Sequence, residues 1–141
     1  MDTVRFFHLP KTVGRSFLEK AVKAVLVGEK KQDFGANIVF VPASQIKQLS
    51  ARYLKRNLVT DILTFRQEQE KSPGDILICL KQVRTNARIF NQDPKIELAR
   101  VVIHGVLHLF GYEDEKGKTK ALTMERKQEK YLKALLCQKD S

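Results

Sequence analysis

The sequence predicts an α+β domain in which helices cover a small mixed β-sheet. Short apolar or β-branched runs alternate with stretches of helical periodicity in the first half of the chain, whereas the second half has helical periodicity only. No repeat, low-complexity tract or Pro/Gly/Ser-rich linker divides the 141 residues. We therefore expect a single domain spanning residues 1–141.

The first half of the chain is expected to contain four strands and two helices. A helix that starts at Thr12 or its neighbours carries apolar residues at helical spacing and ends near Gly28. Ser44 is a reasonable N-cap for a second helix, which runs to about Tyr53. The expected strands are Thr3–Phe7, Ala36–Val41, Asp61–Phe65 and Asp75–Leu80.

Three helices are expected in the second half. The first covers Lys81–Asn91, and the second is capped by Asp93, opened by Pro94 and stopped by Gly111. The third spans roughly Lys118 to Leu136. Its apolar side consists of Ala121, Met124, Tyr131, Leu132 and Leu135. Its lysines alternate with Glu125 and Glu129, so we expect a solvated charged face made of Lys120, Lys127, Lys130 and Lys133.

The charge balance predicts a polyanionic partner. Lysine and arginine outnumber aspartate and glutamate by 26 to 16, giving a net charge of +10. For a soluble chain the commonest such partner is nucleic acid, although a basic surface can also serve solubility alone. No apolar run is long enough for a membrane span, and the first ten residues do not resemble a secretory signal, so we expect a cytoplasmic protein. Cys79 and Cys137 are expected to be reduced thiols of the buried kind.

The helix that ends at Gly111 carries the most informative motif. Polar side chains recur on it every three or four residues, at Glu97, Arg100, His104 and His108. Two histidines at this spacing present two nitrogens to one metal ion. A positive φ at Gly111 would reverse the chain and bring Asp114 back as a third ligand, leaving one coordination position open for catalysis.

Simpler interpretations exist for the same residues. His104 and His108 can be core histidines satisfied by hydrogen bonds, and the acidic residues 113–115 can be a solvated turn. His8 stands alone near the N-terminus, and we assign it no role.

The segment from His104 to Tyr112 reads H-G-x-L-H-L-x-G-Y and resembles the signature of the YbeY family of rRNA maturation endoribonucleases. Residues 60–65, TDILTF, resemble the family's T-D-V-L-S-F strand, and residues 74–78, GDILI, resemble its G-D-I-x-I strand, in the same order. The likeness covers roughly residues 12 to 135. It implies an α+β fold with its metal site on a buried central helix, one zinc or other divalent transition-metal ion, and single-strand-specific cleavage of rRNA during maturation of the small ribosomal subunit.

Two positions depart from the family pattern. Asp114 stands where the family has a third histidine, but aspartate is also a zinc ligand, so the predicted metal ligands are His104, His108 and Asp114. Leu54 stands where the family has an arginine suited to clamp a phosphate, a role that leucine does not support. Lys55 or Arg56 can substitute from the neighbouring positions, and Arg56 is our candidate catalytic cation beside the two histidines.

The alternative function is a catalytically weakened, RNA-binding ribosome-assembly factor, favoured by these same two departures. A metalloprotease is disfavoured, because Gly105 stands where that mechanism needs a glutamate. Few aromatic residues are available for base stacking, which points to recognition of the RNA backbone. The candidate RNA-binding residues are Arg52, Lys55, Arg56, Arg84 and Arg88.

Overall fold

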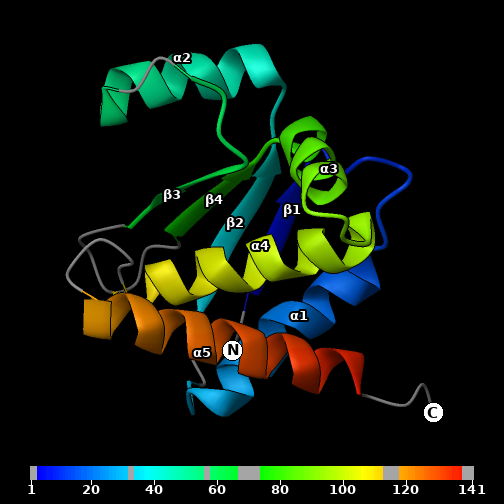
Figure 1. Cartoon of the computed structure of the whole chain (residues 1–141), viewed down its shortest axis with the longest axis vertical. Helices are drawn as coiled ribbons and strands as arrows, with labels where there is room; N and C mark the ends of the chain where they lie inside the picture. The colour runs from blue at the N-terminus through cyan, green and yellow to red at the C-terminus, as the bar shows by residue number, and fades with distance from the viewer. Residues whose placement is uncertain (1–2, 32–33, 56–57, 67–73, 113–117, 138–141) are drawn as a thin grey trace.

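The computed structural model describes residues 3–31, 34–55, 58–66, 74–112 and 118–137. The predicted element order is confirmed. The strands are β1 (Thr3–Phe7), β2 (Gly35–Phe40), β3 (Ile62–Phe65) and β4 (Gly74–Ile78). The helices are α1 (Arg15–Gly28), α2 (Ala43–Leu54), α3 (Leu80–Ile89), α4 (Pro94–Leu109) and α5 (Lys118–Leu136). The predicted α+β class is therefore correct (Figure 1).

The four strands form one mixed sheet in the order β1-β2-β4-β3. The β1–β2 and β2–β4 pairs are parallel, and β3 runs antiparallel to β4, with Leu63 opposite Leu77. Successive side chains of a strand point to opposite faces, and both faces of this sheet carry apolar residues. Ile38, Ile76 and Ile78 face the main core. Leu63 and Leu77 belong to a second, smaller cluster on the other face.

Helices cover both faces unequally. Helix α4 lies across the main-core face with α1 and α5 packed beside it, while α2 lies on the opposite face (Figure 1). The apolar side predicted for α5 is buried at Met124, Tyr131, Leu132 and Leu135. This packing explains why α4 is apolar nearly all round, since it touches the sheet and neighbouring helices at once.

A side-chain cap sets the start of α4. Asp93 caps α4 as predicted, accepting from the backbone N–H groups of Lys95 at 2.8 Å and Ile96 at 3.4 Å. The prediction of Ser44 as a cap was wrong, because the N-cap of α2 is Pro42, two residues earlier, and the helix starts at Ala43. Helix α1 starts at Arg15 with Gly14 as its N-cap.

Cys79 is buried as expected, but Cys137 is exposed, and both are free thiols. Within the described ranges, no helix is long and apolar enough to cross a membrane.

Gly105 lets α4 approach the sheet closely. A Cβ atom placed there would lie 2.8 Å from Ile62 Cδ1 and 3.0 Å from Ile76 Cγ2. We expect Gly105→Leu to lower the free energy of unfolding by about 1 to 3 kcal/mol, because a well-packed core resists added volume. Gly14→Leu is the matched control, since a Cβ there meets only Phe17 Cβ at 3.8 Å. Urea denaturation of both variants measures the difference, and equal losses would contradict the packing argument.

Candidate active site on helix α4

His104 and His108 converge on one point beside α4. Their Nε2 atoms are 2.9 Å apart, their ring centroids are 4.5 Å apart, and the rings stand at 78° to one another. Both residues are partly buried, at the end of the polar stripe that begins with Glu97 and Arg100. The predicted i, i+4 arrangement is therefore present, with two imidazole nitrogens facing the same space.

Gln128 of α5 is a site residue that sequence reasoning missed. Its Oε1 atom lies 2.6 Å from His104 Nδ1, and its Nε2 donates to Glu129 Oε2 at 3.1 Å. A signal for it was available, because Gln128 sits one helical turn from both Met124 and Tyr131. A polar residue on the buried side of an amphipathic helix calls for a hydrogen-bonding partner inside the fold.

Arg100 extends this network between α4 and α5. Its Nη1 donates to Glu97 Oε2 at 2.7 Å, while Nε and Nη2 donate to the two carboxylate oxygens of Glu129 at 3.0 and 3.2 Å. Burial alone would lower the pKa of Arg100, but its bonds to Glu129 and Glu97 raise it above the ordinary value. The polar stripe is thus a connected chain of side chains that ends at the histidines.

The end of α4 is built as the sequence predicts. Gly111 has φ +98°. The N–H of Gly111 donates to His108 O at 2.9 Å and that of Tyr112 to Leu107 O at 3.1 Å, the bond pattern of a Schellman motif. This turn reverses the chain directly after His108. The acidic residues 113–115, including the predicted ligand Asp114, lie outside the described residues.

A buried carboxylate anchors the chain where it leaves this turn. Glu29, at the end of α1, has a side chain only 8% exposed and accepts from Tyr112 Oη at 2.6 Å, from Lys127 Nζ at 2.9 Å and from Tyr131 Oη. The prediction that Lys127 belongs to a solvated face was wrong, because a buried carboxylate needs a compensating cation. Lys130 and Lys133 are exposed as expected, and the side chain of Lys120 lies outside the described residues.

Hydrogen bonding shifts the pKa values of this cluster. Burial alone would raise the pKa of Glu29, but the three donors outweigh it and lower the pKa from 4.5 to about 2. Burial of the phenol and its bond to Glu29 raise the pKa of Tyr131 to about 12. Glu29 is therefore ionised throughout the physiological range. Its hydrogen bond to Tyr112 fixes the chain two residues before Asp114 in the sequence.

The donor set on α4 suits a zinc-like ion. Two nitrogens bound to one tetrahedral zinc lie about 3.3 Å apart, given zinc–nitrogen bonds of about 2.0 to 2.1 Å. The 2.9 Å separation of the Nε2 atoms is within a few tenths of an ångström of that value. An imidazole that ligates through Nε2 usually donates its Nδ1–H to an oxygen, and Gln128 Oε1 lies 2.6 Å from His104 Nδ1. Among the described residues, no group of three His, Cys, Asp or Glu side chains gathers around one point.

The basic residues of α2 do not lie beside the histidines. Arg52 and Lys55 stand at the C-terminal end of α2, on the opposite face of the sheet from α4 (Figure 1). The Arg52 guanidinium lies 5.5 Å from the ring centroid of Tyr53, and Leu54, at the family's arginine position, is 50% exposed. Arg56, our candidate catalytic cation, lies outside the described residues.

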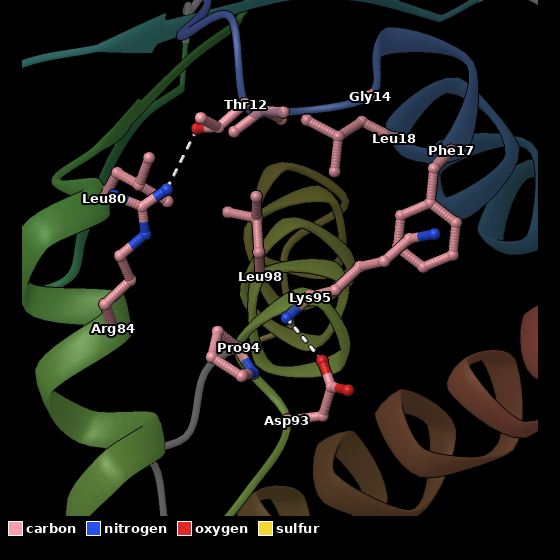
Figure 2. A pocket seen from close by; sticks show the side chains of 11 residues that line it. Thr12, Gly14, Phe17, Leu18, Leu80, Arg84, Asp93, Pro94, Lys95 and Leu98 are labelled. Carbon is pink, nitrogen blue, oxygen red and sulfur yellow. Dashed lines mark hydrogen bonds between the residues drawn. The ribbon is translucent and has the colours of Figure 1, made fainter.

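Arg84 and Arg88 are both exposed on α3, near the N-terminal end of α4. Arg84 Nη2 donates to Thr12 Oγ1 at 3.0 Å and helps to line a pocket of about 410 Å³ (Figure 2). On another wall of the pocket, Lys95 Nζ lies 4.4 Å from the ring centroid of Phe17. At 1.5 Å rise per residue, Lys95 and His108 are about 20 Å apart along the helix axis. The pocket is therefore separate from the histidine site.

Comparison with known proteins supports one family. A family model described as endoribonuclease YbeY matches residues 7–136. The endoribonuclease YbeY of Thermotoga sp. strain RQ2 is 38% identical over 107 residues, covering 76% of this chain and 71% of that protein. The endoribonuclease YbeY of Endomicrobium trichonymphae is 34% identical over 136 residues, covering 95% of this chain and 94% of that protein.

A solved structure agrees with these relatives. The solution structure of TM1509 from Thermotoga maritima superposes with a TM-score of 0.68 at 33% sequence identity, covering 94% of this chain and 89% of that one. The shared description of the relatives supports an endoribonuclease role. Because the family model covers nearly the whole chain and the fold agrees, this protein belongs to the YbeY endoribonuclease family.

Proposed function

We propose that this chain is a metal-dependent, single-strand-specific endoribonuclease that acts in the cytoplasm on rRNA during maturation of the small ribosomal subunit. The observation that carries the proposal is the pair of Nε2 atoms 2.9 Å apart on α4, in a chain of an endoribonuclease family. His104 and His108, with Asp114 from the turn after Gly111, would hold one zinc or another divalent transition-metal ion.

Each part of the proposed site has a physical task. A bound divalent ion would supply Lewis acidity toward a phosphoryl oxygen and lower the pKa of a water molecule. His104 and His108 would hold the ion through their Nε2 atoms, and Gln128 Oε1 lies 2.6 Å from His104 Nδ1. Arg52, Lys55 and Arg56, and Arg84 with Arg88, are proposed to contact the RNA backbone, because a chain with a net charge of +10 gains affinity from each phosphate it neutralises.

The close packing around Gly105 disfavours a metalloprotease. That position faces Ile62 and Ile76 of the sheet, so a glutamate side chain does not fit there without displacing the core. The general base of the protease mechanism therefore has no place at this position.

A test of the proposal is elemental analysis of the purified protein combined with cleavage of a single-stranded rRNA fragment. We expect about one equivalent of zinc in the wild-type chain and a loss of bound metal in Asp114→Ala, because removing one of three ligands opens the site. Asp93→Ala is the control, since its carboxylate caps α4 at the end far from the histidines. A chain that stays empty in excess zinc and does not cleave RNA would contradict the proposal.

The second candidate function, a catalytically weakened RNA-binding assembly factor, is favoured by one observation. Leu54 is half exposed at the end of α2, where the family arginine would be suited to meet a phosphate. In that case the protein would bind the rRNA fragment with a steep salt dependence but leave it intact, and Leu54→Arg would not change the affinity for zinc.

A further inference from the structure

We propose that Gln128 is a positioning residue that holds His104 in its Nδ1–H tautomer, so that the Nε2 lone pair points at His108. The observation behind it is the continuous chain of hydrogen bonds from Arg100 through Glu129 and Gln128 to His104. The effect on metal affinity rests on the proposed function. The tautomer itself does not, because it is a property of the metal-free protein.

The network determines which way the Gln128 amide faces. An ionised carboxylate only accepts hydrogen bonds, so the atom of Gln128 that contacts Glu129 must be the NH₂ group, at 3.1 Å. The amide oxygen then faces His104 Nδ1 at 2.6 Å. Because an amide oxygen also only accepts, the proton of the neutral His104 ring must sit on Nδ1.

Arg100 holds Glu129 in the orientation that this argument needs. Its Nε and Nη2 atoms donate to the two Glu129 oxygens at 3.0 and 3.2 Å, a paired geometry that restricts rotation of the carboxylate. Arginine has no acceptor atom, so Glu129 accepts from Arg100 on one side and from the Gln128 amide on the other. The Arg100–Glu129 pair between α4 and α5 therefore fixes the orientation of the Gln128 amide. The amide in turn fixes which nitrogen of His104 carries the proton.

The tautomer has a consequence for His108. With Nδ1 protonated, His104 Nε2 carries a lone pair, so across 2.9 Å the hydrogen must come from His108 Nε2. A metal ion needs lone pairs on both Nε2 atoms. Binding should therefore move the His108 proton to its other nitrogen while leaving the His104 tautomer unchanged.

The tautomers are measured directly by nitrogen NMR of the imidazole rings in the full chain, metal-free and with zinc, at a pH where the spectra show both rings to be neutral. We expect Nδ1–H at His104 in both states and a change from Nε2–H to Nδ1–H at His108. Gln128→Leu removes the acceptor, so His104 should become a mixture of tautomers. Gln128→Glu keeps an acceptor and should retain the Nδ1–H form.

A matched pair of variants tests whether Glu129 fixes the orientation of the Gln128 amide. Glu129→Gln replaces a pure acceptor by an amide that also donates, so the Gln128 amide can turn over and His104 should show both tautomers. Glu125→Gln makes the same chemical change at an exposed position of α5 and should leave His104 unchanged. Equal spectra for the two variants would contradict the proposed chain.

Zinc affinity, measured by competition with a chromophoric chelator, gives the second readout. We expect Gln128→Leu to weaken zinc binding about 10- to 100-fold and Gln128→Glu to restore it, in line with losses at outer-shell partners of metal-ligating histidines. Unchanged affinity in a folded Gln128→Leu variant overturns the inference, as does an Nε2–H tautomer at His104 in the wild type. If the wild type binds no zinc but shows the expected tautomers, the positioning role stands and the proposed metal dependence fails.

Discussion

In the proposed nuclease, replacing His108 by alanine is expected to reduce the cleavage of single-stranded rRNA by at least about 100-fold and to abolish binding of the proposed metal ion. The reason is geometric, because His108 Nε2 lies 2.9 Å from His104 Nε2 and supplies half of the described donor pair. A site with one imidazole fewer loses one of the two nitrogen ligands that favour zinc over harder cations. The measurements are the cleavage rate at fixed RNA concentration and the zinc content of the same preparation.

The fold should survive this change. His108 is only partly buried and belongs to the polar stripe of α4 rather than to the apolar core. Its loss should therefore change the free energy of unfolding far less than loss of a buried apolar side chain. His8→Asn is the control, because His8 is exposed, has φ 57°, and asparagine tolerates that backbone conformation. Wild-type cleavage by His108→Ala would show that the histidine pair is not the catalytic centre.

The second large effect is expected at Glu29, where a single carboxylate connects α1, the turn after α4, and α5. Its pKa of about 2, compared with an ordinary value of 4.5, corresponds to about 3 kcal/mol of stability at neutral pH. A folded-state pKa below the unfolded value means that this contribution is complete above about pH 4.5. It is lost as the pH falls from there toward 2.

Glu29→Gln should therefore lower the free energy of unfolding by about 3 kcal/mol at pH 7 and by only about 1 kcal/mol near pH 3. Urea denaturation of wild type and variant at the two pH values measures this difference. Glu19→Gln is the matched control, since its side chain is 53% exposed and its pair with Arg15 lies at the surface, where ion pairs contribute little. A loss at Glu29 that does not depend on pH would contradict the assignment of the stability to the ionised carboxylate.

Local sequence determined the elements and the position of the histidines. The β-branched runs and the helical periodicity are properties of neighbouring residues, so the order of strands and helices followed from them. The four-residue spacing of His104 and His108 places them on one face of any α-helix. The caps Asp93 and Gly111 also act through bonds to residues within a few positions.

Contacts between distant residues were decided only by the tertiary structure. Lys127 looks like one of several surface lysines of α5 until Glu29, nearly one hundred residues earlier, is found beside it. Gln128 becomes part of the site because the packing of α5 on α4 brings its amide to His104. Lys55 was considered as a substitute for the family's arginine, yet α2 lies on the opposite face of the sheet from α4. Periodicity states which face of a helix is buried, but the partner of a polar group depends on how the elements pack.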